Sequence, residues 1–176
     1  MRNRTAFILA LYLYLPLAAM ANVPISLPSQ QFIPHADIVG NGTLSLAFWD
    51  IYDVQLVAPN GKWTSKAPYA LEIHYFADIA GKEIAQRTID EIKAQGFKND
   101  AKLASWGSQL AQILPDVKDG DHLSSIATPN GETLFYKNNT RIGIIKDKTF
   151  TPQFFAIWLD EKTSEPALRR NLLGMR

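Results

Sequence analysis

The side chains of this sequence best suited to chemistry are aromatic rings with polar tips. Tyr52, Tyr75 and Trp158 each combine a large apolar ring with a hydroxyl or indole N–H that can orient a bound molecule. They belong to a surplus of aromatic residues, 11% of the chain, most of which lie on predicted strands and helices. Most of these rings should form the core, because aromatic side chains dominate core burial in a small domain. The alternative is that some of them line an apolar pocket between a sheet and its helices.

Several other chemistries have no support in the sequence. The three histidines, His35, His74 and His122, include no pair at metal-ligand spacing on one element. The acidic turn around Gly120 has neither the residue order nor the closing glutamate of a calcium-binding loop. The chain also contains no cysteine, no G-x-S-x-G nucleophile elbow and no glycine-rich phosphate loop. We therefore predict no catalytic residue, no metal and no cofactor from the motifs.

The N-terminus has the pattern of an export signal. Two arginines precede an uncharged apolar run over residues 6–18, and residues 19–21 read Ala-Met-Ala, the small-x-small pattern of signal peptidase sites. The run is short for a hydrocarbon core of about 30 Å, and Pro16 interrupts it, which argues against a membrane anchor. We predict a signal peptide over residues 1–21, cleavage near Ala21, and a periplasmic or secreted protein.

The remaining residues, 22–176, are enough for one domain. Without Arg2 and Arg4, 16 basic residues stand against 17 acidic ones, a net charge of −1. This balance gives no electrostatic footprint for nucleic acid. Because the chain has no cysteine, packing rather than disulfides must stabilise it.

Periodicity predicts an ordered series of strands and helices in this domain. Alternating apolar residues indicate strands over residues 43–48, 51–58, 69–75, 123–128, 133–137 and 142–145. Helical spacing of apolar residues indicates helices that contain residues 84–92, 103–113, 150–158 and 168–172. Ser164 is expected to cap the last helix, two positions before Pro166. The proline-rich segment 22–34 is expected to form an extended arm that lies on the domain.

The order of these elements predicts the fold class. Strands joined by short turns, such as Asn138-Asn139, outnumber strand–helix–strand crossovers. We expect an α+β fold in which a large antiparallel sheet is covered on one face by helices.

With these residues placed, the chain resembles the chalcone isomerase-like superfamily, and within it the exported bacterial branch. The matching blocks run in order through nearly the whole mature chain: Ile51-Tyr52-Asp53, Ala58-Pro59, Pro68 to Leu71, Gly81 to Ala85, Pro115-Asp116-Val117, Gly120-Asp121, Phe135-Tyr136, Ile142-Gly143 and Phe154 to Arg169. The resemblance implies an open-faced β-sandwich, a large antiparallel sheet with a layer of helices against it. It also implies one of three roles, because plant members cyclise chalcones without a cofactor, other members bind fatty acids, and some have no catalysis.

The residues that catalysis needs in this family are missing here. Catalytic members hold the ligand's anionic oxygen with an arginine on an early strand, whereas residues 22–61 contain no Arg or Lys. The family's catalytic tyrosine and asparagine fall on Ala80 and Arg87, and its threonine falls on Ile157 beside Trp158. The resemblance therefore favours a protein that is not an enzyme.

Fatty-acid-binding members clamp the ligand's carboxylate with the same arginine and a nearby tyrosine. Tyr52 can serve as that tyrosine, and the cation would have to be Arg87, Lys137, Arg141 or a protonated His35. Without a cation, a buried carboxylate is driven toward its neutral form, so the ligand would be neutral or absent. The residues predicted to bind the ligand are Tyr52, Tyr75, Arg87 and Trp158.

Three functions remain open at this point. The favoured one is a non-catalytic periplasmic protein that holds a small apolar or amphipathic molecule, fatty-acid-like or phenolic, between the sheet and the helices. The second is a cofactor-free chalcone-type isomerase, an intramolecular lyase. The third is a module that docks another envelope protein, which the arm at residues 22–34 favours because such arms often order only against a partner.

Overall fold

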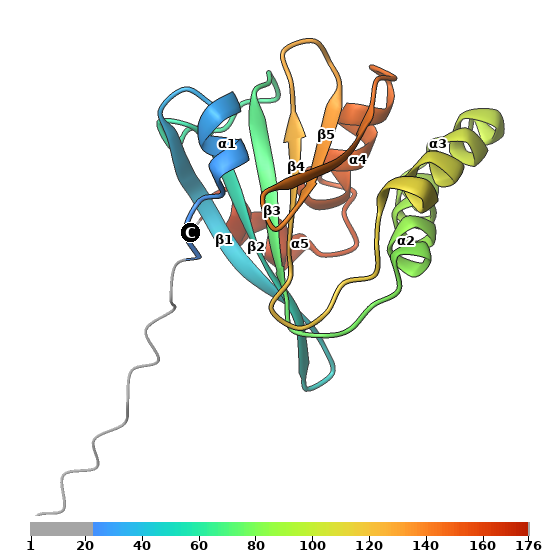
Figure 1. The fold of residues 1–176 in the computed structure, drawn as a ribbon, viewed down its shortest axis with the longest axis horizontal. Helices are drawn as coiled ribbons and strands as arrows, with labels where there is room; N and C mark the ends of the chain where they lie inside the picture. The colour runs from blue at the N-terminus through green and yellow to red at the C-terminus, as the bar shows by residue number, and fades with distance from the viewer. Residues whose placement is uncertain (1–22, 176) are drawn as a thin grey trace, which may run out of the picture.

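A computed structural model describes residues 23–175, which form a six-stranded antiparallel sheet with helices on both faces (Figure 1). The strands follow one another in chain order across the sheet: β1 Ala36–Leu46, β2 Trp49–Pro59, β3 Tyr69–Tyr75, β4 His122–Ala127, β5 Thr133–Lys137 and β6 Thr140–Ile145. The helices are α1 Leu27–Phe32, α2 Gly81–Ala94, α3 Asp100–Ile113, α4 Phe150–Leu159 and α5 Pro166–Leu172. The predicted signal peptide lies outside the described residues. No helix within residues 23–175 is long and apolar enough to span a bilayer.

The predicted fold class is confirmed, and the strand alternation explains how the sheet forms its core. Tyr52, Val54 and Leu56 of β2 point to the face that α2 to α5 cover, as do the alternate residues of β3. The expected Asn138-Asn139 turn closes the β5–β6 hairpin, with positive φ angles of 47° and 67°. Helix α2 ends before Gly96 and α3 before Pro115, also as predicted.

The N-terminal arm lies on the domain as predicted, but the prediction that it is extended is wrong, because residues 27–32 form a helix. Ser26 caps a short helix, because its hydroxyl accepts a hydrogen bond from the Ser29 backbone N–H, and Pro28 fits the first turn. The arm packs on the second face of the sheet, where the neighbouring Ile33 is buried. The Ser26 backbone N–H also donates to the buried carboxylate of Glu72 at 3.0 Å, which anchors the arm to β3.

Two further local predictions need correction. Residues 47 and 48 form the turn between β1 and β2 instead of ending a strand, because Leu46 pairs with Trp49 and leaves a two-residue loop. Ser164 does not cap α5; the N-cap residue is Glu165. The Ser164 hydroxyl instead donates to Glu91 of α2 at 3.1 Å, a contact across 73 residues.

The helices approach the sheet most closely at its two edge strands, and glycine makes this possible. A Cβ at Gly40 of β1 would overlap the backbone carbonyl oxygen of Asn171 in α5, and a Cβ at Gly143 of β6 would lie 2.6 Å from Ile113 Cγ1 of α3. Between these edges, α2 packs against α3 and α4 rather than directly on the sheet. The helix layer therefore rests on the sheet edges and leaves space above its centre.

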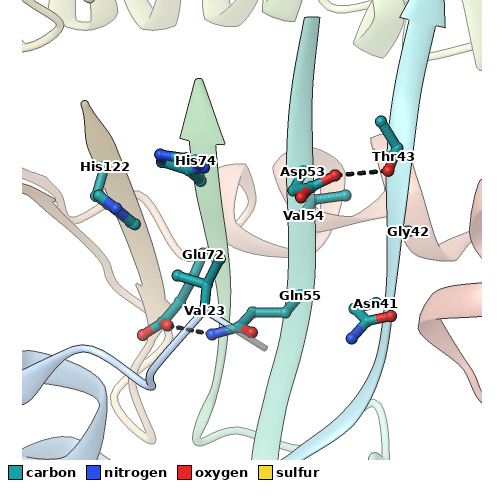
Figure 2. Close-up of a pocket in the computed structure, with 10 residues that line it drawn as sticks. All are labelled: Val23, Asn41, Gly42, Thr43, Asp53, Val54, Gln55, Glu72, His74 and His122. Atoms are coloured by element: carbon teal, nitrogen blue, oxygen red, sulfur yellow. Dashed lines mark hydrogen bonds between the residues drawn. The ribbon is translucent and has the colours of Figure 1, made fainter. Parts of the chain in front are cut away.

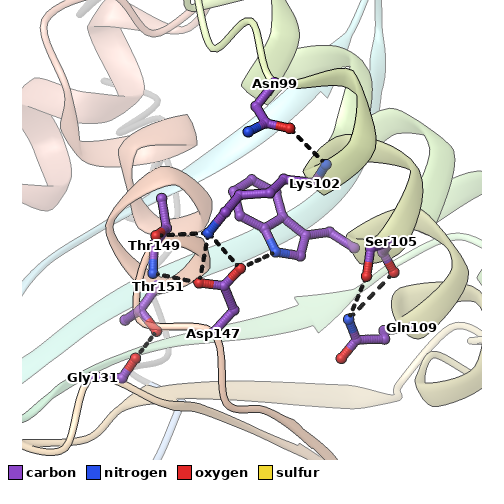
Figure 3. A network of polar contacts seen from close by, with 9 residues as sticks. Asn99, Lys102, Ser105, Gln109, Gly131, Asp147, Thr149 and Thr151 are labelled. Atoms are coloured by element: carbon purple, nitrogen blue, oxygen red, sulfur yellow. Dashed lines mark hydrogen bonds and ion pairs between the residues drawn. The ribbon is translucent and has the colours of Figure 1, made fainter.

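A polar cluster joins α3 to the connection between β6 and α4 (Figure 3). The Asp147 carboxylate accepts hydrogen bonds from Lys102 Nζ at 2.9 Å, from Trp106 Nε1–H at 3.0 Å and from the Thr149 backbone N–H at 2.9 Å. The hydrogen bond from the Lys102 ammonium is the main reason that the pKa of Asp147 falls to about 2. The cluster thus holds its carboxylate ionised and fixes α3 against the edge of the sheet.

Replacing Gly143 should show how tightly α3 sits on β6. We expect Gly143→Ala to lower the free energy of unfolding by about 1–3 kcal/mol, because the new methyl group meets Ile113. Gly107→Ala is the matched control: its Cβ meets only Ile89, at an ordinary 3.4 Å, so alanine in this helix should be neutral or stabilising by up to about 1 kcal/mol. Urea denaturation of both variants measures the difference, and equal effects would contradict the close contact.

The Asp147 cluster also predicts a pH dependence of stability. A carboxylate whose pKa is lowered by folding stabilises the protein above its unfolded pKa, near 3.8, and this contribution disappears as pH falls toward 2. Asp147→Asn should therefore destabilise the protein by roughly 1 kcal/mol at pH 7, a modest value because both ends of the ion pair are about one-third exposed. The gap between wild type and variant should close between pH 5 and pH 2 in urea denaturation. Asp119→Asn, which removes an exposed carboxylate outside this cluster, should give no such gap.

Candidate functional site

The space between the sheet centre and the helices contains a cavity of about 300 Å³. Its walls come from the sheet, from α2 and α4, and from the segment before α5. The lining residues are Leu44, Ile51, Tyr52, Ile73, Tyr75, Ile79, Glu83, Ile84, Arg87, Thr88, Glu91, Leu114, Leu123, Ser125, Phe135, Phe154, Ile157, Trp158, Ser164 and Glu165. Most are apolar, so the cavity suits a molecule with a large apolar part.

The structure places all four residues predicted to bind a ligand in the wall of this cavity. Tyr52 and Tyr75 are directly opposite each other on β2 and β3, with ring centroids 5.9 Å apart in an edge-to-face arrangement. Trp158 reaches them from α4, and its indole N–H donates a hydrogen bond to the Tyr52 hydroxyl at 3.1 Å. Arg87 is a residue of α2, which forms part of the cavity wall, and its side chain is largely exposed. Their contact with a ligand stays a prediction.

Burial keeps the two tyrosines neutral. It raises the pKa of Tyr52 to about 12, although the hydrogen bond from Trp158 acts in the opposite direction. It raises the pKa of Tyr75 further, with a smaller contribution from Tyr52. At neutral pH both hydroxyls can donate hydrogen bonds to a ligand, but neither is a ready source of a phenolate base.

Two hydroxyls on the cavity wall, those of Tyr75 and Ser125, remain accessible and have no hydrogen-bond partner within the described residues. Tyr75 is only 3% exposed and Ser125 is also buried. These two are therefore available to a molecule inside the cavity. Ser125 was not predicted; its position two residues after the inward-facing Leu123 was the signal that could have identified it.

Carboxylates outnumber cations around the cavity. Glu83, Glu91 and Glu165 line it, with Arg87 as the single basic residue of the lining. The Arg87 guanidinium is already paired with Glu91 at 2.6 Å, an i,i+4 ion pair on α2. The other Glu91 oxygen accepts the Ser164 hydrogen bond. The wall is consequently unfavourable for a ligand that carries a negative charge.

The other residues considered as the cation for a ligand carboxylate lie outside the cavity wall. Lys137 pairs with Asp121 at 2.8 Å, and neither it, His35 nor Arg141 lines the cavity. Of the two other positions aligned with catalytic family residues, Ile157 is on the wall but Ala80 is not. Within residues 23–175, the strands that form the sheet side of the cavity place no lysine or arginine on its wall.

A second, much smaller hollow lies on the opposite face of the sheet (Figure 2). His74 and His122 stack there with ring centroids 4.5 Å apart, and the Gln55 side-chain amide donates to Glu72 at 2.8 Å. Burial, and then the neighbouring His74, lowers the pKa of His122. The hollow measures about 30 Å³, room for a water molecule but not for an organic ligand. No group of three or more potential metal ligands occurs among the described residues.

A family model described as chalcone isomerase-like matches residues 36–174, most of the chain. The chain belongs to the chalcone isomerase-like family. Its fold is similar to the crystal structure of the Arabidopsis thaliana fatty-acid binding protein AtFAP1, with a TM-score of 0.61 and 12% identity. That alignment covers 78% of this chain and 86% of the plant protein. No curated protein matches the sequence. The exported bacterial branch stays a prediction.

In this chalcone isomerase-like protein, the Tyr52–Trp158 hydrogen bond connects β2 to α4 at the cavity, and its contribution to stability can be measured. Tyr52→Phe removes the hydroxyl acceptor and leaves the half-buried indole N–H of Trp158 without a partner. We expect this loss to lower the free energy of unfolding by about 1 kcal/mol in urea denaturation. Tyr136→Phe is the control, because the Tyr136 hydroxyl has no hydrogen bond within the described chain and lies on the opposite face. A larger loss of stability in Tyr136→Phe than in Tyr52→Phe would contradict a stabilising role of the Tyr52–Trp158 hydrogen bond.

Proposed function

We propose that this protein is a non-catalytic binding protein for a small apolar or amphipathic molecule, and that it acts after export, in the periplasm or outside the cell. The observation that carries the proposal is the cavity of about 300 Å³ between sheet and helices, with an apolar wall and two unpaired hydroxyls. The fatty-acid binding of AtFAP1, a protein of similar fold, supports the choice of ligand class.

The volume and shape of the cavity favour a slender ligand. A volume of about 300 Å³ is at the lower end of the range for small-molecule pockets. An alkyl chain or a small phenolic ring system would contact Ile73, Leu123 and Phe154 along the wall. The hydroxyls of Tyr75 and Ser125 would then meet a polar atom of the ligand.

The charge of the wall further restricts the ligand to one with a neutral or cationic polar end. A carboxylate would have to compete with Glu91 for Arg87 while lying close to Glu83 or Glu165. Like charges in a partly buried site are unfavourable, because water no longer screens them fully. The tail of the ligand can thus resemble that of a fatty acid although its head does not.

The isomerase alternative has less support from the geometry. Polarising a chalcone ketone needs a cation or a strong donor beside the developing oxyanion. The sheet side of the cavity, as far as the structure describes it, offers only neutral tyrosine and serine hydroxyls. The envelope-module alternative loses its main argument, because the arm that favoured it packs on the protein's own sheet through Ser26 and Ile33.

Calorimetric titration of the mature protein with three C12 probes tests the proposal. At pH 7.5, we expect dodecanol and dodecylamine to bind at least 10-fold more tightly than dodecanoate, because of the carboxylates on the wall. Ile84→Trp, which places a large ring in the cavity, should weaken dodecanol binding at least 10-fold. Gln86→Trp, an exposed position of the same helix outside the lining, is the matched control and should bind normally.

The outcomes separate the parts of this proposal. If no C12 probe and no chalcone binds to the folded protein, the binding function is wrong. If dodecanoate binds as well as dodecanol, the cavity is a binding site but the inferred neutral or cationic head is wrong. Enantiomeric excess in the flavanone formed from an added chalcone would instead establish the isomerase.

A further inference from the structure

The tip of the β1–β2 hairpin exposes large apolar side chains to solvent. Phe48 is 99% exposed, Trp49 76% and Leu46 72%. Phe48 lies in the two-residue turn, and Leu46 and Trp49 are the paired residues that flank it. The hairpin extends beyond the end of the other strands (Figure 1). Single exposed apolar residues are common on proteins, but a cluster at a protruding tip is typical of an interaction site.

The tip belongs to a hairpin whose pairing has a register shift between Leu44 and Ser45, and side-chain contacts hold it in place. Strand pairing continues to the last residues before the turn, Leu46 and Trp49. Below them, the Ser45 hydroxyl donates to Asp50 at 2.6 Å, and the Thr43 hydroxyl donates to Asp53 at 2.5 Å. The fold therefore presents these rings on a defined support.

The same hairpin forms part of the cavity. Leu44, Ile51 and Tyr52 line it, and Leu44 is paired with Tyr52 across the two strands. Leu46 follows Leu44 by two residues, the spacing of side chains on one face of a strand. Apolar side chains thus continue from the cavity along the hairpin to its tip.

We propose that this tip docks on a lipid bilayer with zwitterionic headgroups. Phe48, Trp49 and Leu46 enter the interface between headgroups and acyl chains, and docking brings the hairpin wall of the cavity close to the lipid. An apolar molecule can then pass between the bilayer and the cavity with little exposure to water. The docking itself requires no bound ligand and is independent of the proposed binding function.

The size and composition of the tip favour lipid over a protein partner. A stable protein interface buries about 800 Å² on each partner, whereas this patch consists of three side chains on a narrow, convex turn. Tryptophan and phenylalanine are the residues that peripheral proteins place in the membrane interface. Asp50 lies directly beside the turn, and the cavity wall carries an excess of carboxylates. This charge would be repelled by an anionic surface, which is why the proposal specifies zwitterionic lipid.

Vesicle flotation of the mature protein tests the docking. We expect the protein to float with phosphatidylcholine vesicles and to float less when half the lipid is phosphatidylglycerol. Phe48→Ser/Trp49→Ser should reduce binding to phosphatidylcholine at least 10-fold. Leu27→Ser is the matched control, because Leu27 is also an exposed apolar residue, 62% exposed, but lies on α1 and should not affect binding. Brominated phosphatidylcholine should quench the fluorescence of wild type more than that of Trp49→Phe, which keeps an apolar ring but lacks the fluorophore at the tip.

Four results would overturn the proposal: no flotation with phosphatidylcholine, equal flotation of wild type and the double variant, stronger binding to the anionic vesicles, or equal loss of binding in Leu27→Ser. Sedimentation equilibrium adds a further test. If the wild type is a dimer and the double variant a monomer, the tip is a contact between copies and the lipid proposal is wrong. Dodecanol titration of the double variant distinguishes the two proposals, because its cavity is intact and should still bind if the proposed function is correct.

Discussion

The close contact between helices and sheet at the two sheet edges determines the internal geometry of this protein. At Gly40 and Gly143 the absence of a side chain lets α5 and α3 lie directly on the edge strands. Large aromatic side chains occupy the centre of the sheet, so α2 and α4 cannot approach equally closely there. The two layers therefore meet at their margins, and the space left above the central strands becomes the cavity.

The polar groups of the cavity follow from the same arrangement. Tyr52 and Tyr75 point inward from neighbouring strands, and only Tyr52 receives a hydrogen bond, because Trp158 on α4 reaches one hydroxyl and not the other. On the opposite wall, Glu83, Arg87 and Glu91 recur at i, i+4 and i+8 and share one face of α2. The cavity therefore has hydroxyls without a protein partner on its sheet side, and three carboxylates with one guanidinium on its helix side.

The two faces of the sheet have different roles. On the second face, the short arm with α1 covers the sheet, and the buried Glu72 accepts hydrogen bonds from Ser26 and Gln55, so little space remains. The cavity on the helix face and the apolar tip of the β1–β2 hairpin are joined by one pair of strands. The proposed binding site and the proposed docking site thus share two strands that are joined by backbone hydrogen bonds, whereas the second face of the sheet is closely packed.

Local amino-acid preferences were enough to predict most strands and helices and the family of this protein. Alternation in β2 and β3, the Asn138-Asn139 turn and the stop at Gly96 are short-range signals, each set by the backbone preferences of a few neighbouring residues, and all three agree with the structure. Tyr52, Tyr75 and Trp158 could also be assigned to the inner face, because side-chain direction follows from strand and helix period.

Properties that depend on contacts between distant segments could be read only from the folded protein. The arm became a helix because Ser26 caps it and Pro28 and Ser29 are buried where it contacts β4, and Ser164 turned to Glu91 instead of capping α5. Which cation lines the cavity, whether space remains inside it, and how far Phe48 projects depend on how close the packed layers come. Local sequence cannot encode these distances one residue at a time, because they result from the combined packing of segments that meet only in the folded chain.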